Sequence, residues 1–390
     1  MSKIFLKNGC AQMSLPMAEQ GRRHEIDFLR VASFGLLILF HTSLLYGTRS
    51  WHLNSDDPNR VVDLIAVASH PWRMSLLFFI SGIVTASLFE RRSAGEIRSA
   101  RSRQLLPPFI FGVLFIVPPQ IYVGQYDSFW ERMTYWEFWT YYIHGGIQFE
   151  HLWFLLYLWF YTLVWSLMHR FGPHVPDKLS ASLAGTLRGR WLLLLPVLYL
   201  TAARTTLYPA FGETLDFMHD YCAHAVYLPM FLAGALLAGH ASFWQEIDRC
   251  KWRCALISLF SGTLLAAVVL TLPRDQWPPE MLIAMRMIRS MFQWCTLLTI
   301  LAFARRLITR PNPVVAYLNR AVLTYYVLHQ TFIVLLAYLL KHSGLLQLWS
   351  SIPVLLATCL LCAMSYELKR FLSALANRLH RSSGLADQPS

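Results

Sequence analysis

The chain has 390 residues, of which 55% are hydrophobic and 14% are charged, and its mean hydropathy is +0.40. Because a soluble domain carries about 25% charged residues, this composition excludes a large soluble globule and indicates a protein that crosses a membrane many times. The net charge of +12 invites a nucleic-acid partner. We exclude nucleic acid, because the basic residues recur between apolar segments and form no basic patch interleaved with exposed aromatic residues.

The first 24 residues contain lysine and arginine but no apolar run. We therefore expect no cleaved signal peptide and an uncleaved anchor that begins near Phe28. The apolar segments beyond this point predict an all-α polytopic membrane protein with about ten transmembrane helices. The predicted spans are 28–48, 72–90, 104–124, 151–169, 190–207, 221–240, 254–272, 283–304, 321–341 and 350–368.

Basic residues set the predicted orientation. Most of the 34 lysines and arginines fall near the N-terminus and in every second connecting segment, whereas the other connecting segments are acidic. By the positive-inside rule, both termini are cytoplasmic. We expect a cytoplasmic tail at 1–24, a transmembrane domain at 25–370 and a second cytoplasmic tail at 371–390. The seven cysteines form no disulfide framework, and we expect them to be buried packing residues.

The segment 25–54 carries the residues around which we expect the chemistry to be organised. Arg30 and His41 are eleven residues apart, which is three helical turns plus about 20°, so both lie on one stripe of a helix. Their axial separation is about 16 Å, which places Arg30 at the inner interface and His41 beyond the bilayer midplane. Asp27 precedes Arg30 by one turn and is expected to pair with it. Ionisable groups inside a bilayer indicate function by default.

Other ionisable residues fall inside later spans or at their outer ends. His329 follows Tyr325 and Tyr326, whose phenols are expected to reach it, and His151 opens the fourth span. The alternative is a satisfied structural histidine or, for His151, an anchor in the aromatic belt. Four arginines also fall in outer halves of spans, where snorkelling or pairing with an acidic loop residue is the alternative to a functional role. They are Arg73, Arg204, Arg286 and Arg289.

A basic run, Arg98, Arg101 and Arg103, lies in a predicted cytoplasmic segment. Such a run directs topology, but arginine also binds phosphate through two hydrogen bonds, so the run is a candidate clamp for an acyl-CoA donor. No motif of a soluble nucleotide-binding protein, serine hydrolase or zinc enzyme occurs. The intramembrane histidines are not grouped with acidic residues or cysteines, so we predict no metal site, although the sequence alone leaves ligation by these histidines open.

These residues together resemble the acyltransferase 3 family of integral-membrane O-acyltransferases. The family motif of arginine or lysine, ten residues and histidine in the first span is matched by Arg30 and His41. The arginine motif after the second span is matched by Arg98 and Arg101. Further segments that look like recurrent family segments are Phe78–Gly82, His151–Leu155 and Tyr326–His329. The resemblance covers essentially the whole chain and includes the number of spans.

Three shorter segments most resemble the family members that succinylate osmoregulated periplasmic glucans: Phe40–Leu44, Ser50–Ser55 and Arg73–Met74. The resemblance implies a multi-pass enzyme of a bacterial cytoplasmic (inner) membrane. It implies transfer of an acyl group, expected to be succinyl, from a cytoplasmic CoA thioester to a hydroxyl of a periplasmic glucan or related envelope glycan. Acyl-CoA is then a co-substrate, no cofactor is bound permanently, and association with glucan synthesis proteins is compatible with this role.

The resemblance also implies roles for individual residues. His41 is the expected general base for the sugar hydroxyl, with an acyl-His41 intermediate as the alternative, and Arg30 orients the donor. Arg98, Arg101 and Arg103 bind the donor phosphates. A succinyl carboxylate needs a cation in a low-dielectric site. The residues expected at the carboxylate or acceptor site are Arg73, Arg286, Arg289, His151, Tyr326, His329, Trp51 and Asn54.

Two other functions fit parts of the sequence. A glycan transporter or flippase accounts for ionisable residues and prolines inside spans, but it predicts internal repeats, and none is visible. Such a transporter leaves its glycan unmodified, so turnover discriminates it from an enzyme. A non-catalytic membrane component of a glucan synthesis complex predicts that His41→Ala is harmless whereas deletion is not.

Overall fold

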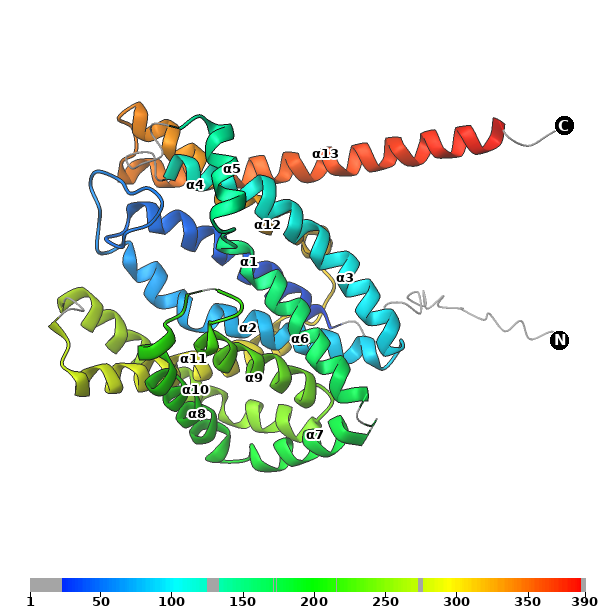
Figure 1. Ribbon diagram of the computed structural model, residues 1–390. Helices are drawn as coiled ribbons and strands as arrows, with labels where there is room; N and C mark the ends of the chain where they lie inside the picture. The colour runs from blue at the N-terminus through cyan, green and yellow to red at the C-terminus, as the bar shows by residue number, and fades with distance from the viewer. Residues whose placement is uncertain are drawn as a thin grey trace, which may run out of the picture.

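A computed structural model describes residues 23–124, 133–170, 172, 174–214, 216–272 and 276–386 (Figure 1). The described residues form helices and no strand, in agreement with the predicted all-α fold. The predicted N-terminal tail, 1–24, lies outside the described residues except for its last two.

The helices are α1 (His24–Tyr46), α2 (Asp63–Phe89), α3 (Ala94–Phe111), α4 (Val117–Gly124), α5 (Tyr135–Gly145), α6 (Trp153–Arg170), α7 (His174–Thr186), α8 (Trp191–Phe211), α9 (Tyr221–Leu237), α10 (Ala241–Thr271), α11 (Pro279–Leu307), α12 (Pro313–His342) and α13 (Ser351–Ala386), with a π turn η1 (Gly112–Ile116) and 3-10 turns η3 (Glu150–Leu152) and η5 (Leu348–Ser350).

Among the described residues, the helices long enough to cross a membrane number one fewer than the ten predicted spans. Within the described residues, nine helical segments are long and apolar enough to cross a bilayer, and each coincides with a predicted span. The remaining predicted span coincides with α9, which is apolar but has only 17 residues. The prediction of an all-α polytopic membrane protein is confirmed. The short helices α5 and α7 are additions that the sequence analysis did not predict.

Helix α2 begins earlier than predicted, at Asp63 rather than at residue 72. Pro71 lies inside α2. Proline removes one backbone donor, and transmembrane helices tolerate this loss where other groups satisfy the freed carbonyls. The earlier start places Arg73 inside a continuous helix rather than at its end.

Helix α3 also begins earlier than predicted, at Ala94 rather than at residue 104. Its start is fixed by a capping box, in which the Ser93 hydroxyl accepts from the Glu96 backbone N–H and the Glu96 carboxylate accepts from the Ser93 backbone N–H. The basic run therefore lies on a helix and not in a loop. Because each residue turns a helix by about 100°, Arg98 and Arg101 share a face, whereas Arg103 lies on another.

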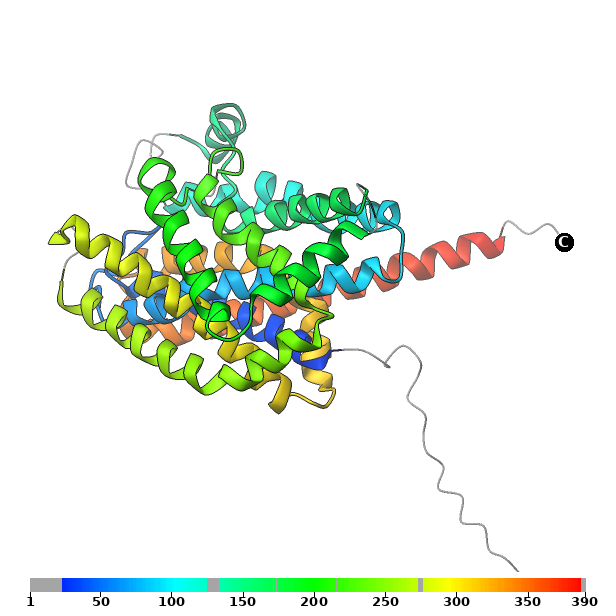
Figure 2. The same ribbon diagram turned by 90° about the horizontal axis from the view of Figure 1, so that it is seen from below.

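Two other helices continue well past their predicted ends. Helix α10 begins at Ala241, thirteen residues before the predicted span at 254. Helix α13 runs from Ser351 to Ala386, and its last turns project beyond the rest of the bundle (Figures 1 and 2). Hydropathy marks only the part of a helix that suits a bilayer, whereas both helices continue through the basic residues that flank it.

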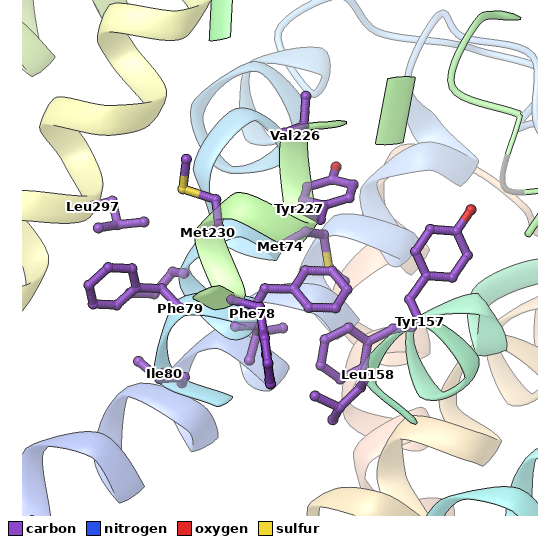
Figure 3. Close-up of a cluster of buried hydrophobic side chains, with 14 of the residues drawn as sticks. Met74, Phe78, Phe79, Ile80, Tyr157, Leu158, Val226, Tyr227, Met230 and Leu297 are labelled. Atoms are coloured by element: carbon purple, nitrogen blue, oxygen red, sulfur yellow. The ribbon is translucent and has the colours of Figure 1, made fainter. Parts of the chain in front are cut away.

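A very close contact between α2 and α9 organises the core. A Cβ on Gly82 would lie 2.0 Å from the backbone oxygen of Phe231, and one on Gly234 would lie 2.0 Å from the backbone oxygen of Phe79. Only glycine fits at both positions, and small residues commonly let membrane helices approach in this way. Figure 3 shows the surrounding buried side chains, which include Met74, Phe78, Ile80, Tyr157, Leu158, Val226, Tyr227, Met230 and Leu297. This packing fixes the position of α2.

Helix α1 lies within the bundle and packs against α2, α12 and α13. One of its faces is buried through residues such as Leu37 and Phe40. The turn η3 packs against α12 and leads into α6. Segments that are far apart in the sequence therefore meet around the second half of α1, where His41 lies.

Candidate active site

A cavity of about 260 Å³ lies between α1, α2, α6, α9 and α12. Five of the residues that the sequence analysis proposed line it: His41, Trp51, Arg73, His151 and Tyr326. Four polar residues that the sequence analysis did not propose also line it: His70, Glu150, Glu213 and Gln330. We call this space the central cavity.

The side chain of His41 is oriented by His329. Nδ1 of His41 lies 2.9 Å from Nε2 of His329. On its other side, Nδ1 of His329 lies 2.8 Å from the backbone oxygen of Tyr326 and 3.1 Å from that of Tyr325. Carbonyl oxygens only accept hydrogen bonds, so Nδ1 of a neutral His329 carries the hydrogen and its Nε2 accepts. His41 therefore donates through Nδ1, and its Nε2 keeps an unprotonated lone pair.

Trp51 covers one face of the His41 ring. The two rings are nearly parallel, with centroids 5.9 Å apart. The loop that carries Trp51 is held by Asn54, whose amide oxygen accepts from the Trp51 backbone N–H and whose amide nitrogen donates to the Leu44 and Arg49 backbone oxygens. Asn54 does not line the central cavity. Asn54 therefore positions Trp51 through the backbone of this loop.

His151 and Tyr326 lie next to the histidine pair. Nε2 of His151 lies 3.0 Å from the backbone oxygen of Val327, so Nε2 carries the hydrogen and Nδ1 is an acceptor. That Nδ1 is buried and has no partner among the described residues. The phenol of Tyr326 donates to the backbone oxygen of His151. The Tyr326 phenol is therefore directed to the backbone of η3 and not to His329, whose ring nitrogens contact the backbone carbonyls of its own helix and His41.

Glu150 forms a polar group at the edge of the central cavity. Its Oε2 lies 3.1 Å from Nε2 of His52 and 3.2 Å from Nε2 of Gln330. The φ angle of Glu150 is +47°, which is uncommon for a residue with a side chain. Residues with such backbone angles cluster at active sites and ligand-binding sites, where the surrounding structure holds them in place.

Arg73 is the buried cation of the central cavity. Only 2% of this residue is exposed. Its Nη1 donates to Ser69 Oγ at 3.2 Å, and its guanidinium lies 4.1 Å from the centre of the Phe40 ring. Its Nε is buried without a partner, and no carboxylate of the described chain lies within ion-pair distance of it. A buried charge without a counter-ion is costly, so an anionic ligand is the natural partner for Arg73.

Glu213, just after α8, neutralises other arginines. Its carboxylate lies 3.4 Å from Arg289 and 4.0 Å from Arg204. Burial raises the pKa of Glu213, but the two guanidinium groups outweigh burial, and the pKa falls to about 2. Arg286 lies over the ring of Tyr208, at 5.7 Å from its centre. Arg286 and Arg289 line a second, larger cavity and not the central one.

Arg30 lies at the opposite end of α1. Its Nη1 donates to Asn319 Oδ1 at 3.1 Å and lies 4.0 Å from the Asp27 carboxylate. Asn319 donates to the same carboxylate at 2.7 Å. The predicted pairing of Asp27 with Arg30 is confirmed, and Asn319 of α12 joins both residues. The orientation of the Arg30 side chain therefore depends on α12 as well as on Asp27.

The structure separates the three arginines of α3. Arg98 donates to Ser166 Oγ at 2.9 Å, and Arg101 donates to Gln104 Oε1 at 3.2 Å. Arg103 is exposed. A cavity of about 800 Å³ at this end of the bundle is lined by the start of α1 and by residues 307–316, not by these arginines. Among the residues that the structure describes, no group of three or more His, Cys, Asp or Glu side chains is placed to hold a metal ion.

Some of the cavity residues absent from the sequence-based candidates had a signal in the sequence, and one had none. His70 precedes Arg73 by three residues on α2, a spacing that places both on one helix face, as it does for Arg286 and Arg289. Gln330 and Glu150 are chain neighbours of His329 and His151. Glu213 carried no such signal, because it lies in a loop and reaches the cavity only through the tertiary fold.

A helical membrane bundle that encloses histidine, glutamate and arginine side chains in a central cavity has the groups for binding or chemistry within the membrane. The profile of the acyltransferase 3 family, described as an acyltransferase domain, matches residues 23–367, and the chain belongs to this family. The chain is a membrane acyltransferase.

Curated relatives carry the name glucans biosynthesis protein C. The chain is 26% identical over 325 residues to that of Salmonella heidelberg (strain SL476), with 79% of this chain and 81% of the relative covered. The same values hold for that of Salmonella typhi. It is 28% identical over 224 residues to that of Escherichia coli O6:K15:H31 (strain 536 / UPEC), with 55% of this chain and 58% of the relative covered. No solved structure matches the chain.

Proposed function

We propose that the chain is an O-acyltransferase of a bacterial inner membrane that moves a succinyl group from a cytoplasmic CoA thioester to a hydroxyl of a periplasmic glucan or related envelope glycan. The family supports acyl transfer, and the name of the curated relatives supports a glucan acceptor. The observation that carries the proposal is the orientation of His41, which is bonded through Nδ1 to His329 and lines the central cavity.

His41 Nε2 is the proposed general base. It takes the proton of the sugar hydroxyl as the hydroxyl oxygen bonds to the carbonyl carbon of the thioester. The carbon–sulfur bond then breaks, the ester is formed, and the proton passes from His41 to the departing CoA thiolate. Throughout, Nδ1–H of His41 continues to donate to His329, which keeps the ring in one orientation.

Arg73 is the proposed partner of the succinyl carboxylate. It lines the same cavity as His41, it is buried, and it lacks a carboxylate partner among the described residues. A charged acyl group can enter a low-dielectric cavity only if a cation meets it there. Arg286 and Arg289 are less suited to this role, because Glu213 already pairs with Arg289 and neither residue lines the central cavity.

The proposed donor site lies at the end of the bundle where α1 begins. Arg101 is half-buried on α3, and its Nε is buried without a hydrogen-bond partner among the described residues. A partly buried guanidinium with an unused donor is suited to an anion, and the CoA phosphates supply one. Arg98 is held by Ser166 and extends this basic surface toward α6.

Turnover tests the proposal. Purified protein in lipid nanodiscs, given succinyl-CoA and a soluble glucan, is expected to release free CoA and to form succinyl esters that mild alkali removes. Both products should appear in equal amounts. Binding of glucan without any esterification would instead favour a transporter, and release of CoA at the same rate without glucan would exclude the glucan as the acceptor.

A further inference from the structure

A second cavity, of about 660 Å³, lies beside the central cavity. It is enclosed by α2, α10 and α11, by the end of α8 and by the loop that follows α1. These elements meet at the left of Figure 1, at the end of the bundle opposite the start of α1. We call this space the outer cavity. Its volume is within the range of about 300–1,000 Å³ that is usual for ligand sites.

The two cavities share a wall. His70 and Glu213 line both of them. The His70 ring stacks on the Phe40 ring, with centroids 5.5 Å apart and planes inclined by 9°. The guanidinium of Arg73 lies 4.1 Å from the centre of the same Phe40 ring. His70 and Glu213 thus form a common wall of the two cavities, and His70 and Arg73 contact the same Phe40 ring.

The lining of the outer cavity combines flat apolar surfaces with hydrogen-bonding groups. Trp277 and Tyr208 contribute aromatic rings, and Val67, Leu265 and Met285 contribute aliphatic surface. The indole N–H of Trp277 donates to the backbone oxygen of Leu272 at 3.3 Å. The polar edge of the Trp277 ring is therefore already satisfied. The ring packs against the cluster of Val67, Leu265, Met285 and Phe292, and it offers the cavity apolar surface only.

Polar groups complete the outer cavity. Arg286 and Arg289 lie one helical turn apart on α11, and Asp63 lies across from them at the start of α2. Asp63 accepts hydrogen bonds from Thr48, and Arg289 pairs with Glu213. These contacts hold the polar side chains in place. A sugar ring presents apolar C–H faces and a rim of hydroxyls, which matches an aromatic surface bordered by fixed donors and acceptors.

We propose that the outer cavity is the binding subsite for the acceptor glycan, and that it delivers one hydroxyl through the common wall of His70 and Glu213 to His41. This inference rests on the proposed glycan acyl transfer. Trp277 holds a sugar ring by stacking, and Arg286, which lies over the Tyr208 ring, bonds the sugar hydroxyls. The acyl group and its carboxylate stay in the central cavity beside Arg73, so the acceptor and the donor occupy different cavities.

Kinetics of variants in nanodiscs test the subsite. Trp277→Ala is expected to raise the KM for a soluble glucan about tenfold, which corresponds to about 1.4 kcal/mol of binding free energy. The KM for succinyl-CoA and kcat at saturating glucan should remain unchanged. Arg286→Met should act in the same direction. Trp349→Ala is the matched control, because Trp349 is 58% exposed and lines neither cavity. An unchanged glucan KM in both Trp277→Ala and Arg286→Met would overturn the subsite.

A binding measurement separates failure of the subsite from failure of the proposed reaction. Laminari-oligosaccharides are titrated against the wild-type protein in nanodiscs without a donor, and binding is followed by isothermal calorimetry. Binding that Trp277→Ala weakens and Trp349→Ala does not would support the subsite even if no ester were formed. Binding that is equal in all three proteins would overturn it, even in an active acyltransferase. Loss in Trp277→Ala of a phospholipid that co-purifies with wild type would also overturn it, since a lipid would then fill the cavity.

Discussion

Nδ1 of His41 and Nε2 of His329 lie 2.9 Å apart, although the two residues are 288 positions apart in the chain. Backbone carbonyls of α12 fix the hydrogen on the far side of His329. The pair thereby determines which nitrogen of His41 remains unprotonated. A base in the wrong tautomer cannot accept the substrate proton, so the contact between α1 and α12 is part of the proposed mechanism.

His329 is a positioning residue, and its removal should slow the reaction rather than weaken binding. We expect His329→Ala to lower kcat about 10²-fold, because His41 loses the acceptor that holds its ring and tautomer. The KM for succinyl-CoA should change little. His329→Gln should recover part of kcat, because an amide oxygen can accept from His41 Nδ1. His342→Ala, an exposed position on the same helix, is the control. Equal kcat in wild type and His329→Ala would refute the role.

Arg73 should determine the preference of the enzyme for a negatively charged acyl donor over a neutral one. Arg73→Met is expected to lower the rate with succinyl-CoA relative to that with acetyl-CoA by at least about tenfold. Arg73 is the one arginine or lysine among the described residues that line the cavity, so the succinyl carboxylate loses its cation. The measurement is the ratio of the two kcat/KM values in nanodiscs. Arg286→Met serves as the control and should leave this ratio unchanged. If Arg73→Met slowed both donors equally, Arg73 would not be the carboxylate partner.

The crossing of α2 and α9 should tolerate no side chain. We expect Gly82→Ala to destabilise the protein by at least about 1–3 kcal/mol, because its Cβ would lie 2.0 Å from the backbone oxygen of Phe231. Thermal unfolding in detergent measures this as a lower Tm. Gly35→Ala on α1 is the matched control, since a Cβ there meets nothing within 4 Å. A Tm of Gly82→Ala equal to that of Gly35→Ala would contradict the close approach.

The arginines of α3 should differ in their effect on the donor. Arg101→Ala is expected to raise the KM for succinyl-CoA about five- to tenfold, because a half-buried guanidinium with an unpartnered Nε is a strong phosphate ligand. Arg103→Ala should change this KM less than about twofold, because an exposed charge is screened by solvent and salt. The KM for glucan is the internal control in both variants. Equal effects of the two substitutions would argue against the proposed clamp.

The membrane fold and the candidate base His41 could be predicted from the sequence, but the partners of His41 and Arg30 in the folded protein could not. Apolar length and the alternation of basic segments depend on local composition, and they predicted the helices well. His41 and Arg30 were visible because a charged group inside a span is costly wherever it lies. The pairing of His41 with His329, and of Arg30 with Asn319, depends on how α12 packs against α1. No local pattern encodes that packing.

The arginines illustrate the same limit. Arg73, Arg286 and Arg289 had equal standing in the sequence as partners of a carboxylate. The structure distinguishes them through Glu213, which pairs with Arg289, and through the α2–α9 crossing, which holds the helix that carries Arg73 at the central cavity. The helix α3 was placed too late because its first turns are polar, and hydropathy does not detect a helix outside the bilayer.

The proposed reaction depends most on His41, the base that removes the proton of the glucan hydroxyl during ester formation. The direct measurement is mass spectrometry of periplasmic glucan from a strain that lacks this gene and is complemented with wild type or with His41→Ala. At equal protein levels in the membrane, wild type should restore alkali-labile succinyl esters and the negative charge of the glucan, and His41→Ala should restore neither. Full restoration of the ester by His41→Ala would contradict the assignment of His41 as the catalytic base.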